Sequence, residues 1–211
     1  MQIIIVCQYD AKGNSDGIGR TVLLKLKSKP LKYAARFIAS ELYTALGWLI
    51  LSSDTVITGV PRSKRGIREN GFDQVELIAC FLSEFSGFEY VPCLVHRGNT
   101  KQKELDYKHR FENAASSYML KEKSGRFSFG SKSYTMKGRQ NIISAEPGTD
   151  NALTMLKRNK SKYISDICGR DVLLIDDVAT TGATLEACSQ ALLSGGASRV
   201  FCISFAGTSD L

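Results

Sequence analysis

The fold is decided by the stretch Val172-Leu173-Leu174-Ile175-Asp176-Asp177-Val178-Ala179-Thr180-Thr181-Gly182-Ala183-Thr184. Its first four residues form a continuous apolar run, which is typical of a strand buried on both faces of a parallel sheet. Two carboxylates and a short loop of small and hydroxyl residues follow. Beyond them Leu185, Cys188 and Leu192 recur at helical spacing. The stretch therefore predicts a strand, a loop and a helix in direct succession.

The loop between this strand and this helix has the features of a phosphate-binding site. N–H groups at the start of a helix have no partner within the helix and point outward, and the threonine hydroxyls add further donors. Each charge-assisted hydrogen bond contributes about 1.5–3 kcal/mol, whereas the helix dipole contributes only ~0.3–1 kcal/mol. Several converging donors therefore decide the affinity. We predict that a phosphate binds to Ala179, Thr180, Thr181, Gly182, Ala183 and Thr184.

The two aspartates distinguish between kinds of phosphate ligand. A nucleoside triphosphate loop carries a lysine in the pattern G-x-x-x-x-G-K-[ST], and this loop has none. Two carboxylates repel a phosphate unless they face another part of the ligand, such as the two hydroxyls of a ribose, which donate to carboxylates. The pattern thus predicts a ribose 5-phosphate group, provided that Asp176, Asp177 and the threonines share an open concavity. A plain helix cap is the alternative, but it explains neither the paired acids nor the threonines.

The remainder of the chain predicts an α/β protein. Strands are expected at 54–59, 90–95, 172–175 and 199–204, and helices after Pro30 and around 75–85. This alternation implies an open, mainly parallel sheet with helices on both faces. A chain of 211 residues suggests a single domain, 1–211, with an amino-terminal subregion of about 1–50 and a basic insert of about 121–167. An apolar fraction of 43% excludes a disordered chain.

The decisive stretch resembles the signature of type I phosphoribosyltransferases that binds 5-phosphoribosyl 1-diphosphate (PRPP). Further blocks resemble the ComF/GntX-type family of these proteins. They are Tyr9 with residues 22–27, the arginine-rich loop 59–74, the mobile-loop residues Arg97, Thr100, Gln102, Leu105, Arg110 and Asn113, and the helix end 195–197. The chain lacks the four-cysteine zinc ribbon with which family members often begin, and residues 121–167 are longer than the usual link.

The resemblance implies a function and a set of site residues. The protein would transfer the 5-phosphoribosyl group from PRPP to a nitrogen acceptor and release pyrophosphate. Asp176 and Asp177 would be catalytic and orient the ribose hydroxyls, with Mg²⁺ bound mainly through PRPP and no metal site formed by the protein alone. The pyrophosphate would bind to Val60, Pro61, Arg62, Arg65 and Arg68, under a lid containing Arg97, Thr100, Gln102 and Arg110. A solvated basic turn and an ordinary surface loop are the alternative interpretations of these two segments.

The charge distribution leaves a second function open. The net charge is +7, and 10 basic against 4 acidic residues lie between Lys121 and Ile167. Such an excess favours an anionic partner near the insert, although a solubilising surface explains it equally well. The alternative function is a non-catalytic PRPP-binding protein, or a protein that handles single-stranded DNA during DNA uptake (competence), with insert aromatics as stacking platforms. A homodimer is also left open.

The cysteines and the apolar runs bear on the location of the protein. Six cysteines are scattered without any C-x-x-C pair, and four lie in apolar segments, so we expect a reduced, cytoplasmic protein without zinc. The most apolar run, 46–51, is far shorter than the ~20 residues of a membrane span. The first residues lack the basic leader of a secretory signal. We therefore expect no membrane span.

Overall fold

Five parallel strands form the centre of the protein, in the order β1-β7-β6-β2-β3. The computed structural model describes residues 3–8, 18–96, 117–121 and 166–208. The strands are β1 (Ile3–Gln8), β2 (Val56–Gly59), β3 (Glu89–Tyr90), β6 (Asp171–Ala179) and β7 (Arg199–Gly207). This confirms the predicted open, mainly parallel α/β sheet.

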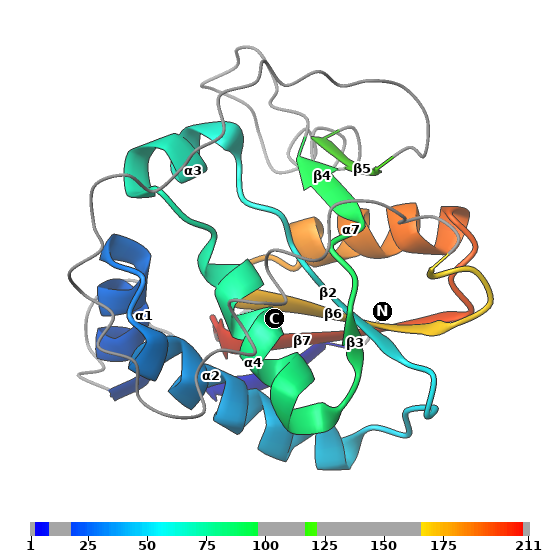
Figure 1. Cartoon of the computed structure of the whole chain (residues 1–211), viewed down its shortest axis with the longest axis horizontal. Coiled ribbons are helices and arrows are strands. Elements are labelled where there is room, and N and C mark those ends of the chain that lie inside the picture. Colours follow the sequence, from blue (N-terminus) through cyan, green and yellow to red (C-terminus); the bar gives the residue numbers. More distant parts are fainter. Residues whose placement is uncertain (1–2, 9–17, 97–116, 122–165, 209–211) are drawn as a thin grey trace.

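Helices cover both faces of the sheet (Figure 1). Alternate residues of β6 point to opposite sides because side chains of a strand alternate. Leu173 and Ile175 pack in one apolar cluster with helices α1 (Ile18–Ser28), α2 (Lys32–Ala45) and α4 (Gln74–Ser86). Val172 and Leu174 pack in a second cluster with α7 (Ala183–Ser194). The strand is thus buried on both faces, as its apolar run predicts. A short 3₁₀ helix, η1 (Leu46–Trp48), follows α2.

Two strands are longer than the sequence predicts. We expected β6 to end at Ile175 and β7 to end at Ser204, but the two remain paired as far as Ala179 and Gly207. The acids therefore lie within β6 rather than after it. The strand expected at 90–95 is instead divided between β3 and β4 (Leu94–His96). Strand β4 leaves the main sheet and pairs antiparallel with β5 (Tyr118–Leu120).

The arginine-rich segment after β2 contains a helix where the sequence predicted only a loop. This helix, α3 (Lys64–Asn70), begins where the Ser63 side chain accepts the N–H of Gly66 at 3.1 Å. It ends at Gly71, whose φ of 79° places it in the left-handed region that favours glycine. Seven residues are too few to show a clear helical period, so the sequence did not reveal it.

Several expectations lie outside the described residues. These are the lid residues and almost all of the basic insert, in which the residue pattern also predicts a short helix at about 151–164. Across the described ranges we find no helix that is both long enough and apolar enough to traverse a bilayer.

Candidate functional site

The two aspartates lie near the carboxyl end of β6 and are almost completely buried. Asp176 is 8% exposed and Asp177 is 7% exposed. The N–H of Asp177 donates to Oδ1 of Asp176 at 2.8 Å. Burial raises the pKa of Asp176 well above its ordinary value, and the neighbouring charge of Asp177 raises it further. The folded protein therefore favours the protonated form of Asp176.

Asp177 is held by two side chains that the sequence did not assign to the site. The amide nitrogen of Gln74, on α4, donates to Oδ2 of Asp177 at 3.0 Å. Nζ of Lys27, in the last turn of α1, lies 3.6 Å from the same oxygen. Gln74 is 103 positions away in the chain, so no local pattern could have revealed this contact. The expectation that both acids open onto a shared concavity is wrong for this structure, because these residues cover Asp177.

The predicted phosphate loop is accessible where the acids are not. Thr180 and Thr181 are exposed, and Gly182 has the left-handed φ of 71° with which the chain turns into α7. Gly182, the N-cap residue of α7, has no side chain to cap the helix, and the N–H of Ala183 makes only a long hydrogen bond, of 3.5 Å, to the Thr181 hydroxyl. The first turn therefore presents N–H donors, as an anion-binding helix start requires. Ala179, which the sequence places in the loop, is instead the last residue of strand β6.

The segment after β2 adjoins the acids, because β2 and β6 are neighbours in the sheet. The N–H of Val60 donates to the carbonyl oxygen of Ile175 at 2.9 Å. The backbone N–H of Arg62 donates to the carboxylate of Asp73 at 3.0 Å, and its guanidinium donates to the amide oxygen of Gln74. Pro61 lies between Val60 and Arg62 in the chain. Arg62 is thereby connected to Asp177 through a single side chain.

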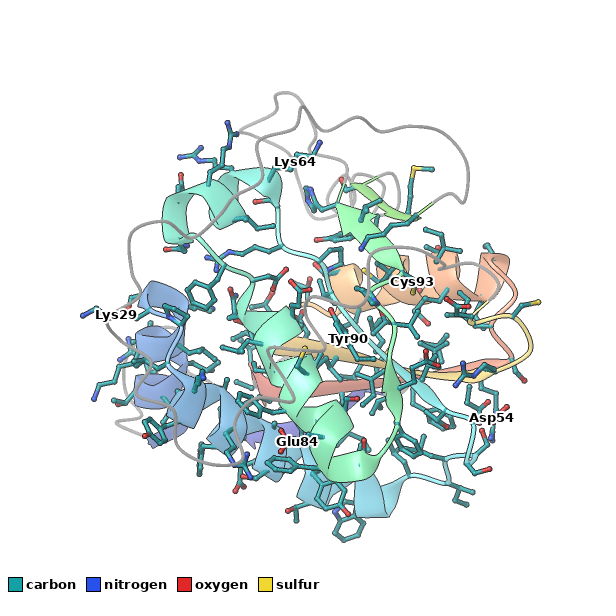
Figure 2. The ribbon with its side chains drawn as sticks, viewed as in Figure 1. Lys29, Asp54, Lys64, Glu84, Tyr90 and Cys93 are labelled. Atoms are coloured by element: carbon teal, nitrogen blue, oxygen red, sulfur yellow. The ribbon has the colours of Figure 1, made fainter. Side chains whose placement is uncertain are left out.

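The other two arginines of this segment do not reach the acids. Arg65 pairs with Glu69 at 2.7 Å on the exposed side of α3, and Arg68 is also exposed on this helix. Lys64, which begins α3, is labelled in Figure 2. Only Arg62 among the three predicted pyrophosphate arginines is therefore brought to the candidate site.

The β4–β5 ribbon contacts α7 beside the predicted phosphate loop. Tyr118 on β5 shares a side-chain hydrogen bond with Thr184, and burial raises the pKa of Tyr118 to about 12. Its ring meets the ring of His96 edge-on, with centroids 5.0 Å apart. The lid residues Arg97, Thr100, Gln102 and Arg110 lie outside the described residues, between these two strands in the chain. The strands that flank the lid are thus attached beside the start of α7.

The acids provide a partial set of ligands for a cation. Among the described residues, no cluster of three or more histidine, cysteine or acidic side chains could hold a metal. Asp176 and Asp177 supply carboxylate oxygens, the donors that Mg²⁺ prefers, and Mg²⁺ often takes its remaining ligands from phosphates and water. Both carboxylates are buried in this structure, and Asp177 is held by Lys27 and Gln74, so they could meet such an ion only after these contacts open.

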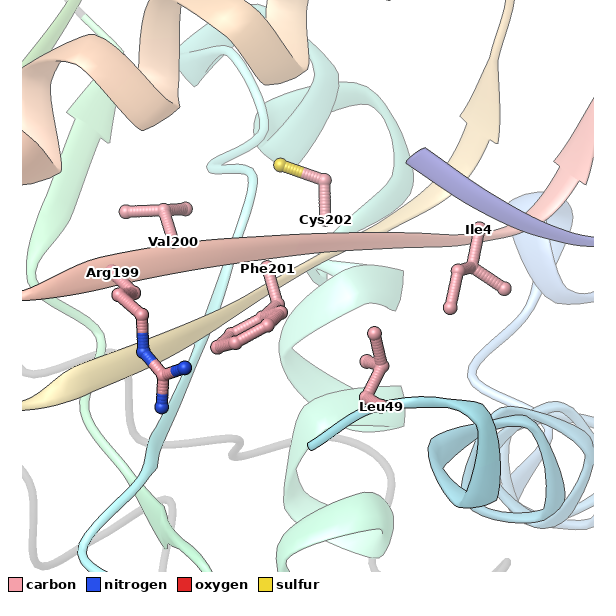
Figure 3. A pocket seen from close by; sticks show the side chains of 6 residues that line it. All are labelled: Ile4, Leu49, Arg199, Val200, Phe201 and Cys202. Atoms are coloured by element: carbon pink, nitrogen blue, oxygen red, sulfur yellow. The ribbon is translucent and has the colours of Figure 1, made fainter. Parts of the chain in front are cut away.

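A cavity of about 260 Å³ lies elsewhere on the sheet (Figure 3). Its lining residues are Ile4, Leu49, Arg199, Val200, Phe201 and Cys202. Arg199 begins β7 and makes two hydrogen bonds, of 2.9 and 2.5 Å, to Asp171 at the start of β6. The cavity therefore lies toward the amino ends of these strands, away from the acids, and is separate from the candidate site.

Comparisons with known proteins leave the family open. No family model matches this chain. No curated protein matches it either. Among solved structures, the crystal structure of TT1426 from Thermus thermophilus is similar at 15% sequence identity and a TM-score of 0.41, over 84% of this chain and 85% of that chain. The fold assignment accordingly rests on the strand order and the packing of the helices.

Proposed function

We propose that this protein is a phosphoribosyltransferase of the ComF/GntX type, which binds PRPP with Mg²⁺ and transfers the phosphoribosyl group to a nitrogen acceptor. The strongest support comes from three features that follow one another closely in a single strand-loop-helix unit: two acids, two exposed hydroxyls and a helix start. The acids Asp176 and Asp177 are followed within a few residues by the exposed hydroxyls of Thr180 and Thr181 and by an uncapped helix start. Arg62 approaches the same strand end from β2.

Each part of this site has a physical task in the proposed reaction. The N–H groups and hydroxyls of residues 180–184 bind the 5-phosphate. The carboxylate of Asp177 accepts hydrogen bonds from ribose hydroxyls once Lys27 and Gln74 release it. Arg62 binds pyrophosphate oxygens through its planar fork. Bound Mg²⁺ would neutralise charge on the pyrophosphate. Departure of pyrophosphate leaves positive charge on the ribose ring, which the neighbouring carboxylate of Asp177 stabilises.

The cellular setting is part of the same proposal. All six cysteines are free, and four of them are buried. Free thiols are typical of a reducing compartment, which supports a cytoplasmic location. A homodimer is compatible with the proposal but no contact of the described residues argues for it.

Calorimetric titration with PRPP and Mg²⁺ tests the site assignment. We expect Asp177→Asn combined with Thr181→Val to abolish PRPP binding, because the pair of changes removes a charge that accepts the diol and a donor to the phosphate. The matched control is Asp54→Asn combined with Thr44→Val, which changes the same residue types at exposed positions. Undiminished binding by the first variant would refute the site.

Turnover separates the transferase from a non-catalytic PRPP-binding protein. Pyrophosphate release from PRPP is measured across a panel of bases and other nitrogen nucleophiles, with and without Mg²⁺. Release with at least one acceptor supports the enzyme, whereas PRPP binding without release supports the non-catalytic protein.

The charge of the insert supports single-stranded DNA as a second candidate ligand. Ten basic residues lie between Lys121 and Ile167. If they bind DNA, the affinity falls steeply with salt and is lost when residues 121–167 are deleted. Salt-independent binding, or none, would eliminate this candidate.

A further inference from the structure

Gln74 lies between Arg62, which we propose to bind pyrophosphate, and Asp177, which we propose to bind the ribose hydroxyls. It is the first residue of α4 and only 7% exposed. Its amide oxygen accepts from the Arg62 guanidinium, and its amide nitrogen donates to Asp177 at 3.0 Å. An amide has one oxygen and one nitrogen at opposite positions, so the bond to Arg62 fixes which end faces Asp177. The state of Arg62 thus affects one of the two contacts that hold Asp177.

We propose that Gln74 is a positioning residue that couples the pyrophosphate half of the site to the ribose half. This inference rests on the proposed function. A phosphate that captures the Arg62 guanidinium removes the donor that holds the Gln74 oxygen. Gln74 is then free to rotate away from Asp177, so that only Lys27 still holds this carboxylate and the ribose hydroxyls have one contact fewer to displace. Pyrophosphate binding therefore strengthens ribose-phosphate binding and, because coupling is reciprocal, the reverse also holds.

Gly66 gives Arg62 the space that this connection requires. A Cβ atom at position 66 would lie 2.6 Å from Nε and 3.0 Å from Cγ of Arg62. Glycine inside a helix costs stability, yet here it lets the arginine side chain pass beside α3 toward Gln74. The substitution Gly66→Ala should therefore displace Arg62 without removing any hydrogen-bonding side chain.

Lys27 provides the second hold on Asp177, from a different helix. Its ammonium lies 3.6 Å from the same carboxylate oxygen that Gln74 contacts. No described contact joins Lys27 to Arg62, so the ion pair between Lys27 and Asp177 does not depend on Arg62. We assign the coupling to the path Arg62–Gln74–Asp177 alone.

Two separate probes measure the coupling by calorimetry in the presence of Mg²⁺. One is inorganic pyrophosphate, and the other is ribose 5-phosphate without its anomeric hydroxyl, which leaves room for pyrophosphate. In the wild type we expect saturating pyrophosphate to lower the Kd of the sugar phosphate about 5-fold or more, within the usual range of such couplings. Gln74→Met and Arg62→Met should abolish this effect. Arg62→Lys should restore part of it, because lysine still donates to the Gln74 oxygen.

The controls separate the coupling from other effects. Gln190→Met makes the same change at an exposed position of α7 and should keep the full effect. If Gln74→Met does not fold, Gly66→Ala tests the same path. Full coupling in Gln74→Met, Arg62→Met or Gly66→Ala would overturn the inference, as would binding of both probes by the wild type without coupling. Failure of the wild type to bind either probe would instead overturn the proposed function.

Discussion

Replacing Asp176 by asparagine should stabilise the protein while damaging its proposed site. Asparagine resembles the protonated acid that the fold favours, because burial and the charge of Asp177 raise the pKa of Asp176. Its side-chain oxygen can still accept the N–H of Asp177, a bond of 2.8 Å in the wild type. The variant therefore loses a like-charge repulsion without leaving this donor unpaired.

The size of the effect follows from the charges around the pair. Two like charges about 4 Å apart repel by about 4 kcal/mol at an effective dielectric constant near 20. Lys27, 3.6 Å from Asp177, offsets part of this, and protonation of Asp176 removes more. We expect a net gain of about 1–3 kcal/mol at neutral pH. For a chain of this size that corresponds to a rise in Tm of roughly 2 to 12 °C.

The pH dependence provides the sharper test. A carboxyl whose pKa is raised by folding stabilises the folded state below its unfolded pKa, near 3.8, and this stabilisation is lost as the pH rises through the folded pKa. Circular-dichroism melts between about pH 4 and about pH 8 should show the stability of the variant rising relative to that of the wild type as the pH rises. Asp54→Asn, at the exposed position labelled in Figure 2, is the control and should show no such trend. If Asp176→Asn is no more stable than the wild type at the highest pH of this series, the reasoning is refuted.

Two further predictions concern residues away from the site. Arg199→Met should destabilise the protein in urea melts, because it leaves buried Asp171 without the guanidinium that donates two hydrogen bonds to it. Arg199 lowers the pKa of Asp171, so the loss of stability is present above pH 3.8 and shrinks as the pH falls below it. Equal loss at all pH values would contradict this assignment. In a thiol assay with Ellman's reagent, exposed Cys168 should react rapidly, whereas Cys80 and Cys202 should stay inert because burial raises their pKa to about 12. Fast reaction that persists when both Cys168 and half-buried Cys7 are replaced by serine would show that a buried thiol becomes accessible.

The sequence predicted those parts of the fold that are encoded locally. The run Val172–Ile175 identified the central strand because a strand covered on both faces needs apolar residues throughout. The extension through Asp176 and Asp177 could not be predicted in this way, because charged residues interrupt that pattern. It arises from continued pairing with β7, as far as Ala179 with Gly207, which is a property of the assembled sheet.

The candidate site, too, was predictable only where its residues are adjacent in the chain. Its acids and threonines are adjacent in the chain, so their chemistry could be interpreted together. The three arginines of the neighbouring segment were indistinguishable by residue type; α3 separates them by directing Arg65 toward Glu69 and leaving Arg62 toward Gln74. The covering of Asp177 by Lys27 and Gln74 depends on the packing of α1 and α4 beside β6. No pattern within any one segment contains that information.

The order of strands in the sheet has a consequence for synthesis of the chain. Strand β1 pairs only with β7 among the described strands, while β2 pairs with β3 and β6. A nascent chain that has been synthesised only as far as β3 therefore contains β1 and the β2–β3 pair. It still lacks β6 and β7, the strands that lie between them in the sheet. The aspartates gain their flanking strand only when the ribosome has delivered β7. Interrupted translation should consequently yield fragments fit for proteolysis, rather than shortened proteins that retain a working site.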